Sequence, residues 1–502
     1  MPGRVVTDAS HDRRADADTD AVGAVVGAPR AEVSVPVVLA AVRALALSDP
    51  DRPALVFDDV LIGYGELWRL LRKRADELGC SPGVVAVPAV HHPEAVVDLL
   101  AVWLAGGTYV PIDPSLPAEH VDAMLASIAD VRDGRVGYVL FTSGSTGRPK
   151  PVALPHRALD TVVPALQRLF AITPEDRVLQ FAALSWDTAF EEILPTLATG
   201  AAVVFSPEAH TGSLSRLLRV VEQAGISVLN LPTAVWHELV WHLGGSRAGL
   251  PRCVRLVVIG GEAVNPARLD AWRALPGADR IPLLNTYGAT ETALISHAGD
   301  LHGPRIDRGV PASVIGRPLG HVRQLVADDG ELLVGGPTLA VGYPGLAEET
   351  ADRFVEHAGV RYFRTGDLVR PDDDGRLQHV GRRDAQVKVR GIRVDPGEVE
   401  AYLLRHPGVA AAAVTGVTLS GRTALAAYVV ASNDRPADAL VAEVRDHLRR
   451  HAPRHLEPAR IDVVPSLVLT SSGKVDRRAT HETYAVTPRE GAAHRDAGKA
   501  TA

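Results

Sequence analysis

The chain has 502 residues, of which 46% are apolar and 23% are charged, with a formal net charge of −7 at pH 7. This length exceeds what one simple core usually supports, so we expect two or more domains in a globular protein of ordinary composition. The negative charge argues against nucleic-acid binding. No apolar run approaches about 18 residues and no signal-peptide pattern is present, so a cytoplasmic protein without membrane partners is the expectation.

Lysine is scarce, because only five of the 53 basic residues are lysines and the rest are arginines. Three of the five, Lys150, Lys388 and Lys474, lie in motif-like surroundings. Lysine carries a compact charge on a flexible side chain, whereas arginine is a planar fork, so we expect these three sites to need lysine. The two cysteines, Cys80 and Cys253, are too few for a disulfide framework, and their apolar neighbours predict buried thiols.

Short β-branched runs alternate with Ala/Leu/Arg-rich stretches along most of the chain. Residues 83–90, for example, have the pattern of a strand and residues 93–105 that of a helix. This alternation predicts an α/β fold of layered, largely parallel sheets. Residues 1–30 and 483–502 show no periodicity and are predicted to be disordered tails.

A domain boundary is predicted near Asp384. Before it, residues 31–383 would form a large N-terminal domain of layered α/β sheets with a β-subdomain. After it, residues 384–482 would form a small mobile α+β domain of a common size. Its helical patterns fall at 396–406 and 436–450, with strand patterns between them.

A polar loop follows a predicted buried strand at 136–141. It reads Phe-Thr-Ser-Gly-Ser-Thr-Gly-Arg-Pro-Lys, so hydroxyls, glycines and a closing lysine stand together at Thr142, Ser143, Gly144, Ser145, Thr146, Gly147 and Lys150. Glycines let backbone N–H groups approach an anion, and the hydroxyls and ammonium add donors, so the loop is predicted to hold phosphate. The common P-loop pattern is absent, and the alternative interpretation is a flexible Ser/Gly linker.

This loop resembles the signature loop of the adenylate-forming superfamily, which includes acyl-CoA synthetases, firefly-type luciferases and the adenylation domains of nonribosomal peptide synthetases. Further motifs follow in the family's order, from 62–67 to the lysine motif at 472–477. The segments at 285–291, 362–368 and 381–400 resemble the family's Asn-x-Tyr-Gly-Pro-Thr-Glu, Tyr-Arg-Thr-Gly-Asp-Leu and hinge motifs. The resemblance implies the family's fold and an ATP-dependent ligase that couples a carboxylic acid to AMP.

The resemblance also implies a role in ATP binding for each motif residue. The loop at 142–150 would hold the β- and γ-phosphates, Glu291 would bind Mg²⁺, and Thr290 would reach the α-phosphate region. Tyr287 would stack on adenine, and Asp367 would accept hydrogen bonds from the ribose hydroxyls. The other nucleotide-binding positions carried over are Gly261, Glu262, Asn285 and Arg382. Two alternatives stay open, namely Glu291 as a carboxylate at a helix N-terminus and Asp367 as a turn aspartate.

Lys474 is the expected catalytic lysine, because a lysine on a small mobile domain can reach the carboxylate and the α-phosphate together. The alternative is a solvated lysine in a surface turn. The hinge motif implies a second half-reaction, in which the small domain pivots about Asp384 and a thiol attacks the acyl-adenylate. Lys388 and Gly391 are then expected near the incoming phosphopantetheine.

The segment 184–193 resembles the Phe-Asp-x-Ser motif of family members that activate amino acids, with Trp186 and Ala189 as departures. Asp187 would then pair with the substrate α-ammonium, and the alternative is a helix cap. The other pocket positions implied by the resemblance are Thr188, Glu191, Asn230, Val258, Gly260, Thr286, Leu294 and Ile295.

Glu191 follows Asp187 by four residues, so both carboxylates would lie on one face of a helix. Because a buried carboxylate needs a partner, we expect a substrate with a second positive charge, such as lysine, ornithine or diaminopropionate. Asn230 would add a hydrogen bond, and Gly260 would leave room for a long side chain. The alternative leaves Glu191 in solvent or paired with a protein arginine.

No carrier-domain pattern follows the last motif, so the expected partner is a separate carrier protein with phosphopantetheine. An MbtH-like helper protein is a further candidate partner. Two other hypotheses are kept. One is an acyl- or aryl-CoA ligase of the same superfamily, against which Asp187 argues. The other is a catalytically silent fold used as a binding partner or adenylate sensor, against which the intact Lys474, Glu291, Asp367 and phosphate loop argue.

Overall fold

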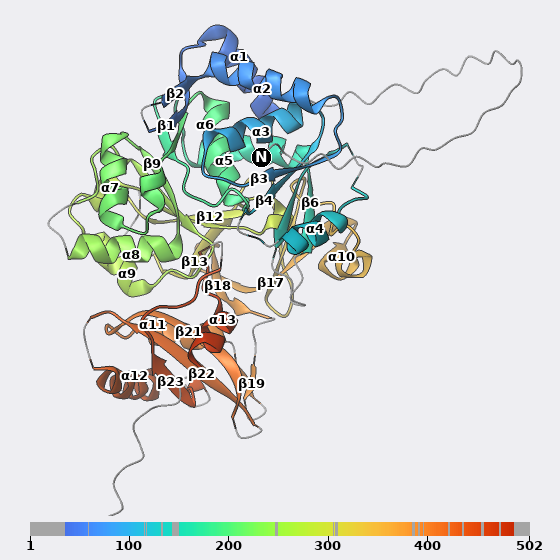
Figure 1. Ribbon diagram of the computed structural model, residues 1–502. Coiled ribbons are helices and arrows are strands. Elements are labelled where there is room, and N and C mark those ends of the chain that lie inside the picture. The colour runs from blue at the N-terminus through green and yellow to red at the C-terminus, as the bar shows by residue number, and fades with distance from the viewer. Residues whose placement is uncertain are drawn as a thin grey trace, which may run out of the picture. The chain divides into compact units, whose positions relative to one another are not determined.

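The structure is a computed structural model (Figure 1). It describes residues 36–58, 60–114, 116, 118–131, 134–142, 150–245, 249–304, 306, 310–383, 387–389, 392–394, 396–419, 422–433, 436–452, 456–470 and 473–485. The predicted tail 1–30 and most of the predicted tail 483–502 lie outside these residues. The predicted hinge residue, Asp384, lies outside them as well.

The chain divides into two compact units. The first comprises Met1–Val264 and Arg268–Val380, and the second comprises Asn265–Ala267 and Gly381–Ala502.

A sheet of 14 strands is the centre of the first unit. Its strands are β1 (Pro53–Phe57), β2 (Val60–Gly63), β7 (Arg177–Leu179), β8 (Ala202–Phe205), β9 (Val228–Pro232), β10 (Leu256–Gly260), β11 (Leu283–Tyr287), β12 (His297–His302), β13 (Val314–Pro318), β14 (Arg323–Val326), β15 (Glu331–Gly335), β16 (Phe354–His357), β17 (Val360–Pro371) and β18 (Leu377–Arg382). The strand order is β14-β15-β17-β18-β13-β12-β11-β10-β9-β7-β8-β1-β2, with β16 paired to β17. The run from β11 to β1 is parallel, as predicted for an α/β fold.

A second sheet of the first unit contains four strands in the order of the sequence. They are β3 (Val84–Pro88), β4 (Thr108–Ile112), β5 (Val136–Thr142) and β6 (Lys150–Pro155). The first three are parallel, and β6 returns antiparallel to β5.

Helices surround these sheets and supply most of the remaining core. They are α1 (Val37–Ser48), α2 (Tyr64–Leu78), α3 (Pro93–Leu104), α4 (Ala118–Ala126), α5 (His156–Leu169), α6 (Thr188–Thr199), α7 (Leu214–Gln223), α8 (Thr233–Gly244), α9 (Pro266–Ala274) and α10 (Ala347–Arg353), with short 3₁₀ turns η1 (Pro207–His210), η2 (Ala278–Arg280) and η3 (Thr290–Thr292). Figure 1 shows α7, α8 and α9 grouped beside β9. On α7, Leu217, Val220 and Val221 are buried at the spacing of one helix face, as an amphipathic surface helix requires.

The second unit is a small α+β body. Its elements are β19 (Val387–Val389), β20 (Ile392–Val394), α11 (Pro396–Leu404), β21 (Val409–Leu419), β22 (Arg422–Ala431), α12 (Ala437–His451), β23 (Arg460–Val463) and α13 (Arg477–Tyr484). The strands β21, β22 and β23 form one sheet, and β22 pairs in parallel with β23. Leu440, Val444 and Leu448 on α12 pack into its core.

The prediction that both thiols are buried is wrong. Cys80 is exposed and Cys253 is partly exposed. Cys80 lies just past the end of α2, where Gly79 has a φ of 75° and turns the chain away from the helix. Among the described residues, no helix combines the length and the apolar character needed to cross a membrane.

Candidate nucleotide and amino-acid site

Tyr287 and Asp367 meet in the first unit although they lie far apart in sequence. Tyr287 ends β11, and its hydroxyl donates to Oδ2 of Asp367 in β17 at 2.6 Å. Nε2 of His379 in β18 lies 3.2 Å from Oδ1 of the same carboxylate, which is 7% exposed. The residues expected at adenine and ribose are therefore neighbours. His379 joins them, and no motif in the sequence could have revealed it.

Glu291 and Lys150 lie around Tyr343, a residue that sequence analysis missed. The Tyr343 hydroxyl donates to Oε1 of Glu291 at 2.8 Å. Nζ of Lys150 lies 5.5 Å from the centre of the Tyr343 ring and 2.5 Å from Oε2 of Glu349. Burial, followed by the charge of Glu291, raises the pKa of Tyr343, so its hydroxyl remains a proton donor.

The predicted phosphate loop is described only at its two ends. Thr142 ends β5, Lys150 begins β6, and the two residues pair in register, so β5 and β6 form an antiparallel pair up to these two positions. Ser143, Gly144, Ser145, Thr146 and Gly147 lie outside the described residues.

The turn after β10 would offer the flat backbone expected beside adenine. Gly260 ends the strand, and Gly261 has a φ of 86°, which glycine adopts readily. The Thr233 hydroxyl donates to the Gly260 carbonyl at 3.0 Å, and Glu262 follows in the same turn. On the next strand, Nδ2 of Asn285 donates to the Val314 carbonyl at 2.8 Å and ties β11 toward β13.

The segment after β11 is tightly packed. A Cβ on Gly288 would lie 1.8 Å from the Leu294 carbonyl oxygen. Ala293 and Leu294 have φ angles of 56° and 64°, which few residues with side chains adopt. Thr290, in η3, is 9% exposed. This packing fixes the backbone around Thr290, Glu291 and the pocket residues that follow.

Asp187 and Glu191 lie at the start of α6. Asp187 is the N-cap residue, but its side chain makes no capping hydrogen bond. Glu191 is 7% exposed, and its Oε2 accepts a hydrogen bond from Nδ2 of Asn230 at 3.0 Å. The solvent-exposed alternative for Glu191 is therefore wrong. Burial, followed by the charge of Asp187, raises the pKa of Glu191 to about 8, while the Asn230 hydrogen bond acts in the opposite direction.

Glu192, beside Glu191, is a second buried carboxylate that sequence analysis did not assign. It is 1% exposed and accepts hydrogen bonds from the backbone N–H groups of Phe181 and Ala182, each at 3.0 Å. Burial raises its pKa. Because these donors come from the segment after β7, Glu192 anchors α6 and holds Asp187 and Glu191 in place.

Neighbouring strands place the remaining pocket positions. Asn230 pairs with Val258, and Gly260 pairs with Thr286. A Cβ on Gly260 would lie 2.5 Å from Oγ1 of Thr286, so the room predicted at this glycine is filled, on that side, by its strand neighbour. The other positions named for the pocket are Thr188, which begins α6, and the buried Leu294 and Ile295.

The second unit carries two of the three lysines singled out in the sequence, Lys388 and Lys474. Lys474 is exposed, and its backbone N–H donates to Oγ1 of Thr470 at 3.2 Å within a short turn. Lys388 lies in β19, and Arg382 ends β18. Gly391 lies outside the described residues.

The fit of Mg²⁺ rests on Glu291. Among the described residues, His, Cys, Asp and Glu do not gather in groups of three or more that could hold a metal. A nucleotide-bound Mg²⁺ needs only one or two carboxylates, because phosphates and waters supply its other ligands. One carboxylate whose Oε1 is fixed by Tyr343 fits that kind of site.

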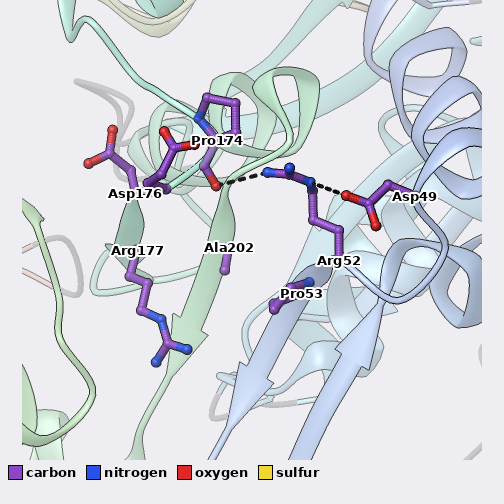
Figure 2. Close-up of a pocket in the computed structure, with 8 residues that line it drawn as sticks. Asp49, Arg52, Pro53, Pro174, Asp176, Arg177 and Ala202 are labelled. Atoms are coloured by element: carbon purple, nitrogen blue, oxygen red, sulfur yellow. Dashed lines mark hydrogen bonds and ion pairs between the residues drawn. The ribbon is translucent and has the colours of Figure 1, made fainter.

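A separate cleft in the first unit has a volume of about 300 Å³. Figure 2 shows the residues that line it. It lies where β1, β7 and β8 begin, whereas the pocket residues lie toward the carboxyl ends of the parallel strands. Three of its charged groups are in ion pairs, since Arg52 lies 2.9 Å from Asp49 and Asp176 lies 2.5 Å from Arg255. A fourth, Arg177, donates to the Ala224 carbonyl at 2.8 Å. We therefore assign this cleft to the framework of the fold rather than to catalysis.

A run of parallel strands in which β11 ends at a tyrosine bonded to Asp367, together with a second α+β unit that carries an exposed lysine, is the arrangement of an adenylate-forming enzyme. The chain belongs to the AMP-binding enzyme family: the model of that family matches residues 42–132 and 128–344, and the model of the AMP-binding enzyme C-terminal domain matches residues 398–474.

Similar proteins include nonribosomal peptide synthetases. The isonitrile lipopeptide synthase of Streptomyces coeruleorubidus is 39% identical over 477 residues, which cover 85% of this chain and 32% of the relative. The phenyloxazoline synthase MbtB of Mycobacterium sp. (strain MCS) is 34% identical over 491 residues, 86% of this chain and 41% of the relative. The chain thus spans less than half the length of these relatives.

Solved structures share the fold. The amide bond synthetase McbA from Marinactinospora thermotolerans gives a TM-score of 0.74 at 25% identity, over 89% of this chain and all of its own. Klebsiella oxytoca NpsA, in complex with 3-hydroxyanthranilyl-AMSN, gives a TM-score of 0.75 at 24% identity, over 90% of this chain and 99% of its own. The predicted superfamily and the α/β fold with a smaller C-terminal unit are confirmed.

Proposed function

We propose that the chain activates an amino acid with a second amino group as its aminoacyl-AMP and passes it to the phosphopantetheine thiol of a carrier protein. An oxygen of the substrate carboxylate attacks the α-phosphorus of ATP, the bond to the pyrophosphate oxygen breaks, and pyrophosphate leaves. The thiol sulfur then attacks the acyl carbon, the thiol proton is lost, and AMP leaves with the electrons of the broken acyl–oxygen bond. The amino-acid step agrees with the kinship to nonribosomal peptide synthetases.

In this proposal, the large domain at 31–383 binds both substrates and the small domain at 384–482 carries Lys474. Lys474 stabilises the charge that develops between the carboxylate and the α-phosphate. Glu291 holds Mg²⁺, which neutralises phosphate charge when bound. Asp367 accepts hydrogen bonds from the ribose. After adenylation the small domain pivots at Asp384, and Lys388 and Gly391 serve the thiol.

The observation that carries the choice of substrate is the buried Glu191 beside Asp187. In this proposal the Asp187 carboxylate binds the substrate α-ammonium. Glu191 is 7% exposed, and its described partner, the Asn230 amide, is uncharged. A second carboxylate in the same pocket is costly unless a cation enters with the ligand. A side-chain ammonium supplies that cation, which supports lysine, ornithine or diaminopropionate.

Amino-acid-dependent ATP–pyrophosphate exchange over a panel of basic and neutral amino acids tests the proposal. We expect exchange with one or more diamino acids and at least about tenfold less with leucine or phenylalanine. Strong exchange with leucine or phenylalanine, and none with any diamino acid, would refute the role of Glu191. Activity only with acyl or aryl acids and free coenzyme A would establish the CoA-ligase alternative.

A further inference from the structure

Tyr343 is fixed on several sides in the first unit. It is 4% exposed, and its backbone N–H donates to Oγ1 of Thr350 at 3.0 Å. Its ring meets the Phe354 ring edge-on, with the ring centres 5.7 Å apart. A tyrosine held in this way presents its hydroxyl at one defined point.

Charged groups from three segments surround that hydroxyl and ring. Oε1 of Glu291 accepts the hydroxyl hydrogen at 2.8 Å, and the positive charge of Arg353, at the end of α10, also acts on the Tyr343 hydroxyl. The Lys150 ammonium lies over the ring at 5.5 Å from its centre. Tyr343 therefore connects the carboxylate expected at the metal with the lysine expected at the phosphates.

The hydrogen bond to Glu291 leaves Oε2 for another ligand and limits the rotation of the carboxylate. Groups that orient a metal ligand commonly contribute tenfold or more to metal affinity, because Mg²⁺ demands near-ideal octahedral geometry. Packing alone would need only the aromatic ring of Tyr343. Its hydroxyl, buried against a carboxylate, points to a further task.

We propose that Tyr343 is a positioning residue that holds the Glu291 carboxylate ready for magnesium-bound ATP and thereby sets the magnesium requirement of adenylation. The inference rests on the proposed function, in which Glu291 is the metal ligand. Tyr343 itself contacts neither the nucleotide nor the reacting atoms in this assignment.

The test compares Tyr343→Phe with the wild type across a range of Mg²⁺ concentrations, using ATP–pyrophosphate exchange. We expect the Mg²⁺ concentration for half-maximal rate to rise about tenfold, while the maximal rate at saturating Mg²⁺ falls less than about threefold. A second measurement needs no turnover. The Mg²⁺ dependence of the rise in unfolding temperature caused by ATP should shift to higher Mg²⁺ by a similar factor.

Tyr64→Phe is the matched control, because the Tyr64 hydroxyl is also buried and donates to the Leu197 and Ala201 carbonyls at 3.1 and 2.8 Å. It should leave the Mg²⁺ requirement unchanged. An unchanged Mg²⁺ requirement in Tyr343→Phe would overturn the inference. An equal loss of rate at every Mg²⁺ concentration would overturn it as well, since that result indicates a structural role.

Two further outcomes separate the inference from the proposed function. A wild-type protein that shows no exchange with any amino acid contradicts the proposed function, and the ATP-dependent unfolding temperature then still decides the role of Tyr343. Should Tyr343→Phe fail to fold, Thr350→Ala loosens Tyr343 while keeping its hydroxyl. A smaller shift in the same direction supports the inference, and no shift refutes it.

Discussion

Glu191 combines burial with a nearby like charge, so its ionisation is opposed in the empty pocket. Because its pKa is raised to about 8, the carboxylate that would pair with a substrate ammonium becomes charged only as the pH approaches that value. We expect kcat/KM for a diamino acid to rise with pH up to about 8, since this parameter reports groups of the free enzyme. In Glu191→Gln this rise should disappear, and kcat/KM for the diamino acid should fall at least about 100-fold at pH 8. An unchanged pH profile in the variant would contradict the pairing.

The raised pKa of Glu191 also predicts how the stability of the ligand-free protein depends on pH. Here the stability falls with rising pH, whereas the activity rises. The pKa of Glu191 in the folded protein, about 8, lies above the ordinary value of 4.5 for a free carboxyl. The contribution of Glu191 to the free energy of unfolding is therefore fully present below the pKa of the unfolded chain, 4.5. It is lost as the pH rises through the pKa in the folded protein, about 8. Glu191→Gln should raise the free energy of unfolding of the ligand-free protein at pH 8 by about 2–5 kcal/mol, and by less than about 1 kcal/mol at pH 5.

Chemical denaturation at the two pH values measures this difference. Glu77→Gln, on the exposed face of α2, is the control and should change the free energy of unfolding equally little at both. A variant Glu191→Gln that is less stable than the wild type at pH 8 would show that the carboxylate is stabilising, contrary to its assignment to a ligand.

At the scale of elements, local sequence patterns predicted where helices and strands lie, but they did not predict which side chains of different elements contact each other. The helix predicted at 93–105 is observed as α3 at Pro93–Leu104, and the strand predicted at 83–90 as β3 at Val84–Pro88. Periodicity and turn residues act within a few positions, so the sequence carries them directly. Tyr343, His379 and Glu192 were missed because each bonds to a residue of another segment, 52, 12 and 11 residues away along the chain, and nothing in their own neighbourhoods distinguishes them.

The segment between β11 and β12 gives a prediction at this scale. Gly288 lies against the Leu294 carbonyl, where a Cβ would come within 1.8 Å of the oxygen. Gly288→Ala must push this backbone apart, so we expect a loss of about 1–3 kcal/mol in the free energy of unfolding and a reduction of exchange activity by about tenfold or more. Gly320→Ala is the matched control, because a Cβ there meets nothing within 4 Å. Equal behaviour of the two variants would mean that the segment is not as constrained as its packing indicates.

For the whole molecule, the division into two units puts the residues proposed to bind substrates in one unit and the proposed catalytic lysine in the other. The first unit contains the hydrogen-bonded pairs Tyr287–Asp367, Glu191–Asn230 and Tyr343–Glu291. The second unit contains Lys474. In the proposed function, the first unit binds both substrates. Adenylation then requires Lys474, which belongs to the second unit. A movable unit can then present a different surface for the thiol step.

Lys474→Ala tests this separation of tasks. Because Lys474 is exposed, its removal should leave the unfolding temperature unchanged and should weaken ATP binding little. Exchange activity should fall by about 10²–10³-fold, the usual consequence of losing a group that stabilises charge in the transition state. Lys73 is also exposed, so the control variant Lys73→Ala should keep full activity.

Transfer of a chemically supplied aminoacyl-AMP to a phosphopantetheine carrier should continue in Lys474→Ala, because in the proposed function the thiol step uses the other position of the second unit. Undiminished exchange would remove Lys474 from catalysis, and loss of both half-reactions together would show that the two units do not divide the work.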